Sequence, residues 1–404
     1  MSGTVTIPTT MQRPELSSSD RRLALGFSHA MINILAFRNL VHDRVRLAAT
    51  LVGIVFAVVL VSVQLGLFLG FARTTSAIIS NSGADLWLMA PHTTNVDEAI
   101  PIADRKAIQA AAVPGVARAV KFVVEFARLK KPNGGADSTI VVGFDPADRM
   151  GGPWSVVEGS VADLRRPNAV MIDELYRSKL GVTHMGQVVE INGIRARIVG
   201  FTRGIRSFTQ SPYIFTSISN AMDYGGMQAD RTKFVLIELA DGADLEKVRR
   251  QLQNRVSGVE VLTTAEFSRR TQFYWMFTTG AGAALLIAAI MGLMVGAVIV
   301  SQTLYATTMD HLSEFGTLRA IGAPARFIYG VIIRQAIFSG VIGYAIGLAI
   351  SLLIVAVARN AGPAIVLPLG LVTGTFVLTL AMCVGAAAIS IRKVTHLDPT
   401  LVFK

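Results

Sequence analysis

The chain has 404 residues, of which 52% are hydrophobic and only 16% are charged, whereas an average soluble protein has about 25% charged residues. So little polar surface cannot cover a soluble globule of this size, which argues against a wholly soluble, a disordered or a fibrous protein. The net charge is +11, and the arginines lie beside apolar runs without interleaved aromatic residues, so we expect no nucleic-acid partner. The single cysteine, Cys383, excludes an intrachain disulfide.

The amino-terminal region falls into two parts before the first long apolar run. Residues 1–27, of which the first 20 are rich in Ser, Thr and Pro, are predicted to form a flexible cytoplasmic tail. Residues 28–46 alternate apolar side chains, such as Ile34 and Phe37, with polar ones, such as Arg38. This pattern predicts an amphipathic helix at the cytoplasmic membrane surface. A plain extension of the first span is the alternative.

Apolar stretches long enough to cross a membrane follow, since ~20 helical residues rising ~1.5 Å each span the ~30 Å hydrocarbon core. Transmembrane helices are expected at residues 47–72, 273–309, 328–358 and 366–391. No stretch alternates in polarity as a barrel strand must. The second is too long for one crossing, so we expect an extended helix that leaves the membrane at one or both ends. The aromatic residues from Phe273 to Phe277 are typical of a membrane interface.

The positions of Lys and Arg predict the orientation of these spans. Basic residues gather in the amino-terminal segment, in the connection between the second and third spans, and in the tail at 392–404. The positive-inside rule assigns all three to the cytoplasm, with both termini inside. Residues 73–272 then lie outside the cytoplasm, and residues 359–365 form a short outer loop. The first span begins too late and lacks a cleavage site, so it is not a cleaved signal peptide.

The large insert alternates strand and helix patterns, which predicts a compact mixed α/β domain. Strands are expected at 85–89, 119–129, 138–144, 169–172, 188–191, 194–201, 213–216, 234–239 and 259–262, and helices at 103–112, 173–180 and 244–255. Asn192-Gly193 joins two of these strands, and both residue types accept the positive φ of a primed turn. This dipeptide therefore predicts a β-hairpin.

The insert has no recognisable catalytic or metal-binding motif. The six histidines are scattered, and neither G-x-S-x-G nor H-E-x-x-H occurs. Asp145, Asp173 and Glu174 are candidates for an acid pair, but carboxylates at a helix start are more often placed there by the helix dipole. We therefore expect a protein that is not an enzyme by itself and binds no metal or cofactor.

A short motif lies between the second and third spans. Phe315 and Leu318 stand beside Glu314 and Arg319 in a segment that Gly322 and Pro324 end. A simple amphipathic loop helix explains the geometry. An apolar pair with charged flanks, however, is typical of a segment that inserts into a partner's groove.

This motif resembles a known family. Glu314-Phe-Gly-Thr-Leu-Arg-Ala-Ile-Gly-Ala323 is similar to the signature that follows the second span of FtsX/MacB-type ABC transporter permeases, and Ala36-Phe-Arg-Asn-Leu40 and Leu397-Asp-Pro399 also resemble family features. Val298 to Tyr305 resembles the DevC-like branch. The resemblance implies an α-helical membrane protein with four transmembrane helices and a large extracytoplasmic α/β (MacB-like periplasmic) domain between helices one and two. It also implies a homodimer in the bacterial inner membrane.

No G-x-x-x-x-G-K-[ST] motif occurs, so the chain has no P-loop for ATP phosphates. The resemblance implies a separate ABC ATPase subunit that holds ATP and Mg²⁺, with residues 310–327 as the coupling segment that docks on it. The docking residues implied by the family are Glu314, Phe315, Gly316, Leu318, Arg319 and Gly322.

Pairs of glycines one helical turn apart occur in three spans and permit close helix packing. They are Gly66 with Gly70, Gly292 with Gly296, and Gly343 with Gly347. Packing within one chain and packing across a dimer are both open. The resemblance favours the first two pairs as the dimer seam.

Two functions agree with the resemblance. One is an export permease that works with an ATPase and a periplasmic membrane-fusion adaptor. The other is an FtsX-type module that transmits motion to a cell-wall hydrolase without transporting a solute.

Overall fold

The computed structural model describes residues 34, 44–209, 211–310, 317, 325–358 and 364–395. The predicted amino-terminal tail, most of the predicted surface helix, most of the coupling segment and most of the carboxy-terminal tail lie outside these residues, whereas residues 392–395 of that tail belong to a helix. The chain forms two compact units. The first draws on residues 1–60, 291–349 and 372–404, and the second on residues 61–290 and 350–371.

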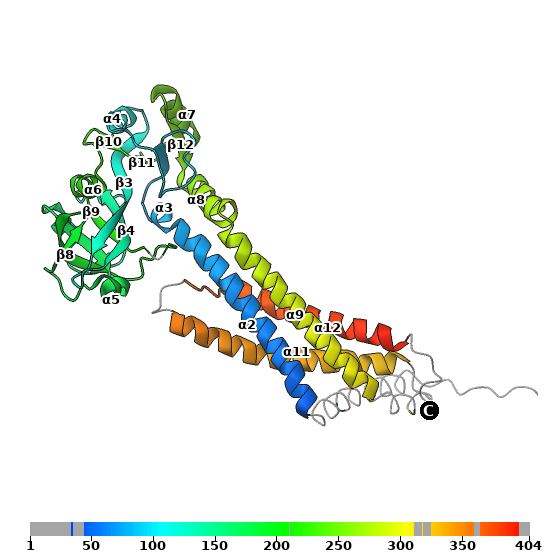
Figure 1. The fold of residues 1–404 in the computed structure, drawn as a ribbon. Helices are drawn as coiled ribbons and strands as arrows, with labels where there is room; N and C mark the ends of the chain where they lie inside the picture. The colour runs from blue at the N-terminus through cyan, green and yellow to red at the C-terminus, as the bar shows by residue number, and fades with distance from the viewer. Residues whose placement is uncertain are drawn as a thin grey trace, which may run out of the picture. The chain divides into compact units, whose positions relative to one another are not determined.

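Among the described residues, four helices are long and apolar enough to cross a membrane. They are α2 (Arg44–Thr75), α9 (Ala281–Asp310), α11 (Ala325–Ala358) and α12 (Leu369–Thr395) (Figure 1). Helices suit these sequences because every backbone N–H and C=O must find a partner inside the segment in hydrocarbon. The predicted fold class, with four such helices and the outer domain between the first two, is confirmed.

The second apolar stretch differs from the extended helix predicted over 273–309. Helix α8 (Thr264–Phe273) ends where this range begins, one π turn (Tyr274–Thr278) follows, and helix α9 begins only at Ala281. The reason is Gly280, whose φ of +81° lies in the left-handed region that ends a right-handed helix. A count of uncharged residues cannot detect such a break, because glycine is also common within membrane helices.

The first unit is a helical bundle with an apolar core. All four long helices contribute buried side chains, which include Ile54 and Val58 of α2, Val300 and Leu304 of α9, Ile332 and Ala336 of α11, and Cys383 and Ala387 of α12. Cys383 is therefore a packing residue, which agrees with its place among apolar neighbours.

The second unit contains the outer domain, whose main sheet has ten strands in the described residues. The strands are β1 (Leu86–Met89), β3 (Val116–Lys130), β4 (Ala136–Phe144), β5 (Val156–Glu158), β6 (Ala169–Asp173), β7 (Val188–Ile191), β8 (Ile194–Thr202), β9 (Tyr213–Ser217), β11 (Phe234–Leu239) and β12 (Glu260–Thr263). Their order is β12-β1-β11-β3-β4-β9-β6-β8-β5, and β7 pairs with both β3 and β8. Strands β3, β4, β9, β6 and β8 are neighbours in this order, and β7 pairs with both β8 and β3. These six strands therefore form a closed barrel.

The long strand β3 divides the domain into two lobes. Its first half pairs with β11, and its second half pairs with β4. One lobe packs the β1–β11–β12 side against helices α4 (Arg105–Ala111) and α7 (Leu245–Arg255). In the barrel lobe, α5 (Arg177–Leu180) and α6 (Ile218–Gly225) cover a second core. A third core, rich in aromatic residues, includes Trp87, Phe122, Phe234 and Phe267.

The predicted hairpin is confirmed. Strands β7 and β8 are antiparallel, and Ile191 pairs with Ile194 across the turn. Asn192 and Gly193 have φ values of +47° and +84°, as a primed turn requires. The Asn192 side chain also accepts a hydrogen bond from the Arg128 amide at 2.9 Å, so the turn is fixed to β3. All the predicted strands are found, whereas α6, α8 and the short strands β2 (Ile102–Ala103), β5 and β10 (Arg231–Thr232) were not predicted.

Candidate functional site

The predicted ATPase-docking residues lie outside the described residues: Glu314, Phe315, Gly316, Leu318, Arg319 and Gly322. Thr317, between them, is described and is helical. The described chain reaches Asp310, the last residue of α9 and the first of the coupling segment. Asp310 forms an ion pair with Arg46, in the first turn of α2. The described start of the coupling segment is therefore tied to the first span.

Glycines bring α2 and α9 into close contact within the first unit. A Cβ atom at Gly292 would lie 2.5 Å from Leu60, and one at Gly296 would overlap Ala57. Gly53 of α2 faces Ile299 of α9 in the same way. Each of these glycines therefore has a packing role within the chain, and a role in a dimer seam stays a prediction.

Gly66 and Gly70 have a different neighbour, the segment that precedes α12. The Val366 amide donates a hydrogen bond to the Gly66 carbonyl at 3.1 Å. A Cβ at Gly66 would lie 2.9 Å from Ile365, and one at Gly70 would overlap the Ala364 carbonyl. Within the second unit, these two glycines form a seat for residues 364–367.

Gly70→Val is expected to destabilise the protein by about 3 kcal/mol, near the upper end for overpacking, because the obstructing atom is backbone and cannot rotate away. The thermal unfolding midpoint of the full-length chain in detergent measures the effect, as a fall of several degrees. Gly374→Val is the matched control, since nothing lies within 4 Å of a Cβ at Gly374 in α12. Equal unfolding midpoints for the two variants would contradict the close packing of residues 364–367 against Gly66 and Gly70.

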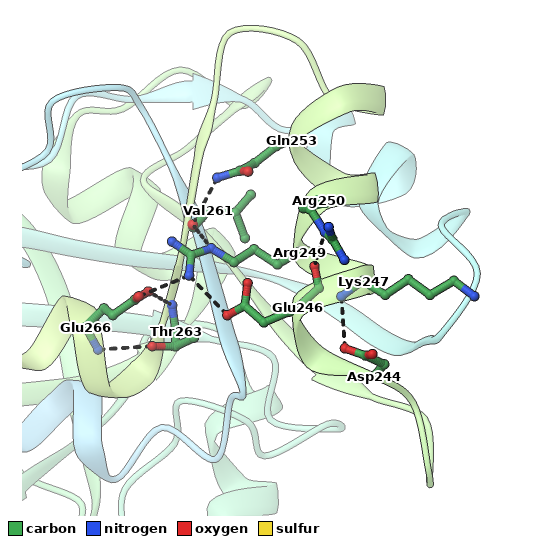
Figure 2. Close-up of polar contacts among 9 residues, drawn as sticks. All are labelled: Asp244, Glu246, Lys247, Arg249, Arg250, Gln253, Val261, Thr263 and Glu266. Atoms are coloured by element: carbon green, nitrogen blue, oxygen red, sulfur yellow. Dashed lines mark hydrogen bonds and ion pairs between the residues drawn. The ribbon is translucent and has the colours of Figure 1, made fainter.

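The outer junction, defined here as α8, the π turn and the loops that hold them, connects the outer domain to α9. Helix α8 begins with a capping box: the Glu266 amide donates to Thr263 Oγ1 at 3.1 Å, and the Thr263 amide donates to Glu266 Oε2 at 2.9 Å. Arg249 of α7 joins this cap from the side. Its guanidinium donates to Glu266 Oε1 at 3.0 Å and to the Val261 carbonyl at 3.1 Å (Figure 2).

These bonds hold the Glu266 carboxylate in its charged form. Burial raises the pKa of Glu266, but the bonds from Thr263 and Arg249 outweigh burial and leave the pKa below its ordinary value. The start of α8 is therefore fixed to both α7 and β12.

Arg270 holds the last turn of α8. Its two terminal nitrogens donate to the two carboxylate oxygens of Glu260 at 2.9 and 2.7 Å, a bidentate geometry. The same guanidinium donates to the Thr93 carbonyl at 3.2 Å. The hydrogen bond to Glu260 raises the pKa of Arg270, and the reciprocal bond lowers the pKa of Glu260. Arg270 thus ties α8 to strand β12 and to the loop after β1.

The loop after β1 also forms hydrogen bonds with the π turn. Trp275 Nε1 donates to Asp97 Oδ2 at 3.2 Å, and the Tyr274 hydroxyl donates to Glu98 Oε2 at 3.3 Å. Asn95 shapes the loop, because its side-chain oxygen accepts from the Asp97 and Glu98 amides. Phe273 and Phe277 of the aromatic run are exposed, whereas Tyr274 and Trp275 face the domain. Only part of this run can therefore serve as an interfacial belt.

Phe208 completes the outer junction. Its ring lies 4.4 Å from the Trp275 ring and 5.5 Å from the Phe71 ring near the end of α2. The loop that carries Phe208 is anchored by Asp173, which accepts from the Ile205 amide at 2.7 Å. Asp173 also caps the following 3₁₀ turn, as expected of a helix-start carboxylate. The barrel lobe therefore contacts the end of α2 and the π turn that precedes α9.

The sequence did not predict the outer junction. Arg270 and Asp97 are ordinary charged residues in sequence, and Phe208 has no motif around it. The one available signal was Trp275 within the aromatic run. The described residues contain no group of three or more His, Cys, Asp or Glu that could hold a metal.

Family comparisons agree with this architecture. Residues 47–255 match the MacB-like periplasmic core domain, and residues 286–399 match the FtsX-like permease C-terminal domain. The chain therefore belongs to the FtsX/MacB-type ABC transporter permeases, which are multi-pass membrane proteins.

Individual relatives are distant. The chain is 25% identical to the pyoverdine export ATP-binding/permease protein PvdT of Pseudomonas fluorescens over 90% of its own length and 58% of that protein. It is 24% identical to an uncharacterized ABC transporter permease of Mycobacterium tuberculosis, over 91% of its own length and 98% of that protein. The periplasmic region of MacB from Actinobacillus actinomycetemcomitans aligns with 48% of this chain and 96% of its own length, at 11% identity and a TM-score of 0.37.

Proposed function

We propose that this chain is the permease subunit of an ABC-type exporter whose ATP is hydrolysed on a separate subunit. The observation that carries the proposal is the family membership of both parts, the outer core domain and the carboxy-terminal permease region. Relatives named as ABC transporter permeases, one of them named for pyoverdine export, support it. The missing P-loop motif agrees with an ATPase on another chain.

In this proposal the coupling segment, residues 310–327, docks on the ATPase. Phe315 and Leu318 fill an apolar groove, Glu314 and Arg319 make charged contacts at its rim, and Gly316 allows close backbone approach. The Arg46–Asp310 ion pair supports the idea that α2 and α9 receive the motion together.

The outer junction would then receive the motion from α9. Its bidentate Arg270–Glu260 pair and its bonds from Trp275 and Tyr274 support a firm connection to the outer domain. We further propose a homodimer with two ATPases in the inner membrane, both termini in the cytoplasm, and a periplasmic membrane-fusion adaptor. Within the family, the Val298 to Tyr305 sequence favours the DevC-like branch.

Deletion of this chain tests the exporter function directly. We expect export to fall to the level of a strain whose ATPase subunit is inactive, and expression of the intact chain to restore it. The control is that the complex still assembles with the inactive ATPase. Unchanged export of every candidate substrate in the deletion strain would exclude transport as the function.

A second function, transmission of motion without transport, is favoured by one observation. The hydroxyls of Thr303, Thr307 and Thr308 in α9 donate to carbonyls of their own helix, one turn earlier, and so does Thr379 in α12. With their hydrogens bonded inside the helix, these hydroxyls offer no donor to a passing solute in this conformation. In this case the outer domain would regulate a cell-wall hydrolase. Co-purification with a hydrolase, and loss of hydrolase activation on mutation of the outer domain, would support it.

A further inference from the structure

The outer junction contains a buried carboxyl group that the packing of the domain leaves incompletely bonded. Asp97 is only 2% exposed. Its Oδ2 accepts the indole hydrogen bond from Trp275, while its Oδ1 has no partner among the described residues. Nor does Asp97 form an ion pair in this part of the chain. An ionised carboxylate with one neutral donor is costly to bury.

The groups around Asp97 do not compensate a negative charge. Glu98, next in the same loop, adds a second carboxylate. The buried Tyr213 of β9 interacts electrostatically with Asp97 and with the buried Tyr176, but among the described residues neither tyrosine hydroxyl forms a hydrogen bond with Asp97. Ser207, in the loop of Phe208, approaches both tyrosines, and Arg206 beside it faces Tyr176. Tyr274, on the π turn, is bonded to Glu98 and not to Asp97.

A neutral carboxyl group suits this environment better than a carboxylate. Its carbonyl oxygen still accepts from Trp275, and no negative charge is left on a buried oxygen without a partner. Burial, opposed by the Trp275 bond and helped by Glu98, raises the pKa of Asp97 from 3.8 to about 7. Both the burial of Asp97 and its raised pKa therefore favour the protonated form in the closed structure.

We propose that Asp97 and Trp275 form a proton-dependent clasp, which holds the π turn on the outer domain when Asp97 is neutral and releases it when Asp97 is ionised. Ionisation strengthens the Trp275 bond itself, but burying the charge costs more, so the carboxylate is favoured only where the open clasp exposes it to water. Asp97 is thus a positioning residue, since it acts on α9 through Trp275. The clasp gains its functional meaning from the proposed transmission through the outer junction. It couples that transmission to the pH on the side of the membrane that the domain faces.

The direction of the pH dependence follows from linkage. When the clasp opens, Asp97 is exposed and its pKa returns toward 3.8, so the closed form binds the proton more tightly. Opening therefore becomes easier by about tenfold per pH unit between about 4 and 7, and it levels off above about 7. Between pH 5 and pH 8 the opening equilibrium should rise on the order of 100-fold.

Hydrogen exchange of the full-length chain in lipid nanodiscs tests the clasp. Peptides covering residues 271–280 are followed at pH 5 and pH 8, and rates are corrected for intrinsic exchange. We expect protection of the wild-type π turn to fall on the order of 100-fold at the higher pH. Peptides from β3 and β4, which do not contact Asp97, serve as the internal control and should not change.

Two variants separate the clasp from general effects of charge. Asp97→Asn keeps an oxygen for Trp275 but cannot ionise, so the π turn should stay protected equally at both pH values. Glu98→Gln is the matched control, because it removes the neighbouring carboxylate and leaves Asp97 able to ionise. Its profile should keep the wild-type slope with a lower midpoint. If Asp97→Asn does not fold, the pH dependence of protection in the wild type and in Glu98→Gln still tests the clasp.

Wild-type protection that is equal at both pH values after correction would overturn the proposal. A persistent pH dependence in Asp97→Asn would overturn it as well. The exchange measurement needs no ATPase and no substrate, so its result is independent of the export assay. Loss of exporter function with an intact pH response would therefore count against the proposed function and not against the clasp.

Discussion

Simultaneous replacement of Phe315 and Leu318 by alanine is expected to abolish co-purification of this permease with its ATPase subunit. Apolar anchors buried at the centre of an interface contribute about 2 kcal/mol or more each. Loss of both corresponds to a roughly 1,000-fold weaker Kd. Pull-down of the ATPase by the tagged full-length permease, followed by titration of the purified subunits, measures the change. This is the largest effect that we expect from any pair of substitutions in the chain.

The control for this experiment comes from exposed apolar residues of the outer domain. Ile108 in α4 is 76% exposed and Val157 in β5 is 45% exposed. Alanine at both positions removes similar apolar surface without touching the coupling segment, so association should match the wild type. Wild-type association of the Phe315/Leu318 variant would refute the docking assignment and leave the outer junction unaffected.

Arg270→Ala is expected to uncouple the outer domain from α9 and to lower stability by about 2 kcal/mol. The substitution leaves the Glu260 carboxylate and the Thr93 carbonyl without their donor, and partial exposure of the pair reduces the cost below the 3–5 kcal/mol typical of fully buried pairs. The Arg270 side chain is 36% exposed and that of Glu260 is 26% exposed. Thermal unfolding of the full chain reports the stability, and ATP-dependent export reports the coupling.

The pH dependence of this second effect has a definite sign. The Arg270 bond lowers the pKa of Glu260 in the folded state. The stability that the Arg270–Glu260 pair contributes is therefore fully present above the unfolded-state pKa of Glu260, which is about 4.5. This stability is lost as the pH falls through the lower pKa that Glu260 has in the folded chain. The difference between Arg270→Ala and wild type should be largest at neutral pH and should shrink in acid.

Two further variants sharpen the Arg270 experiment. Arg270→Lys keeps the positive charge but loses the bidentate geometry, so an intermediate effect is expected. Arg195→Ala is the matched control. Arg195 lies on β8 next to the hairpin turn and is exposed, and its side chain has no hydrogen bond or ion pair in the described part of the chain. This variant should behave as wild type. An export rate and a midpoint for Arg270→Ala equal to those of Arg195→Ala would show that the pair transmits nothing.

The elements of the fold were largely predictable because each carries a local signal. The four long helices follow from runs of apolar residues, and the hairpin follows from Asn192-Gly193 between two β-rich segments. Helices α6 and α8 were not predicted because they are short, with 8 and 10 residues, and each follows a strand without an intervening loop. The one local signal for α8 is the pair Thr263 and Glu266, which has the spacing of a capping box.

The two parts of the candidate site differ in what the sequence can say about them. The proposed docking motif is continuous in sequence, so a resemblance can suggest it, and it stays a prediction. The outer junction is assembled from residues far apart along the chain: Phe71, Asp97, Phe208 and Trp275 come from four separate segments. Gly66 and Gly70 show the same limit, because their spacing predicts close packing but not that the partner is the segment before α12.

By itself, the sequence determined that the chain crosses a membrane four times, carries one α/β domain and contains no P-loop. These properties depend on composition, periodicity and short motifs, which act over a few residues at a time. Only the tertiary structure decided which glycine meets which neighbour, where the second span breaks and which side chains hold it to the outer domain. Such contacts depend on chain folding across hundreds of residues, and burial in that fold is what turns Asp97 from an ordinary acid into a group that titrates near neutral pH.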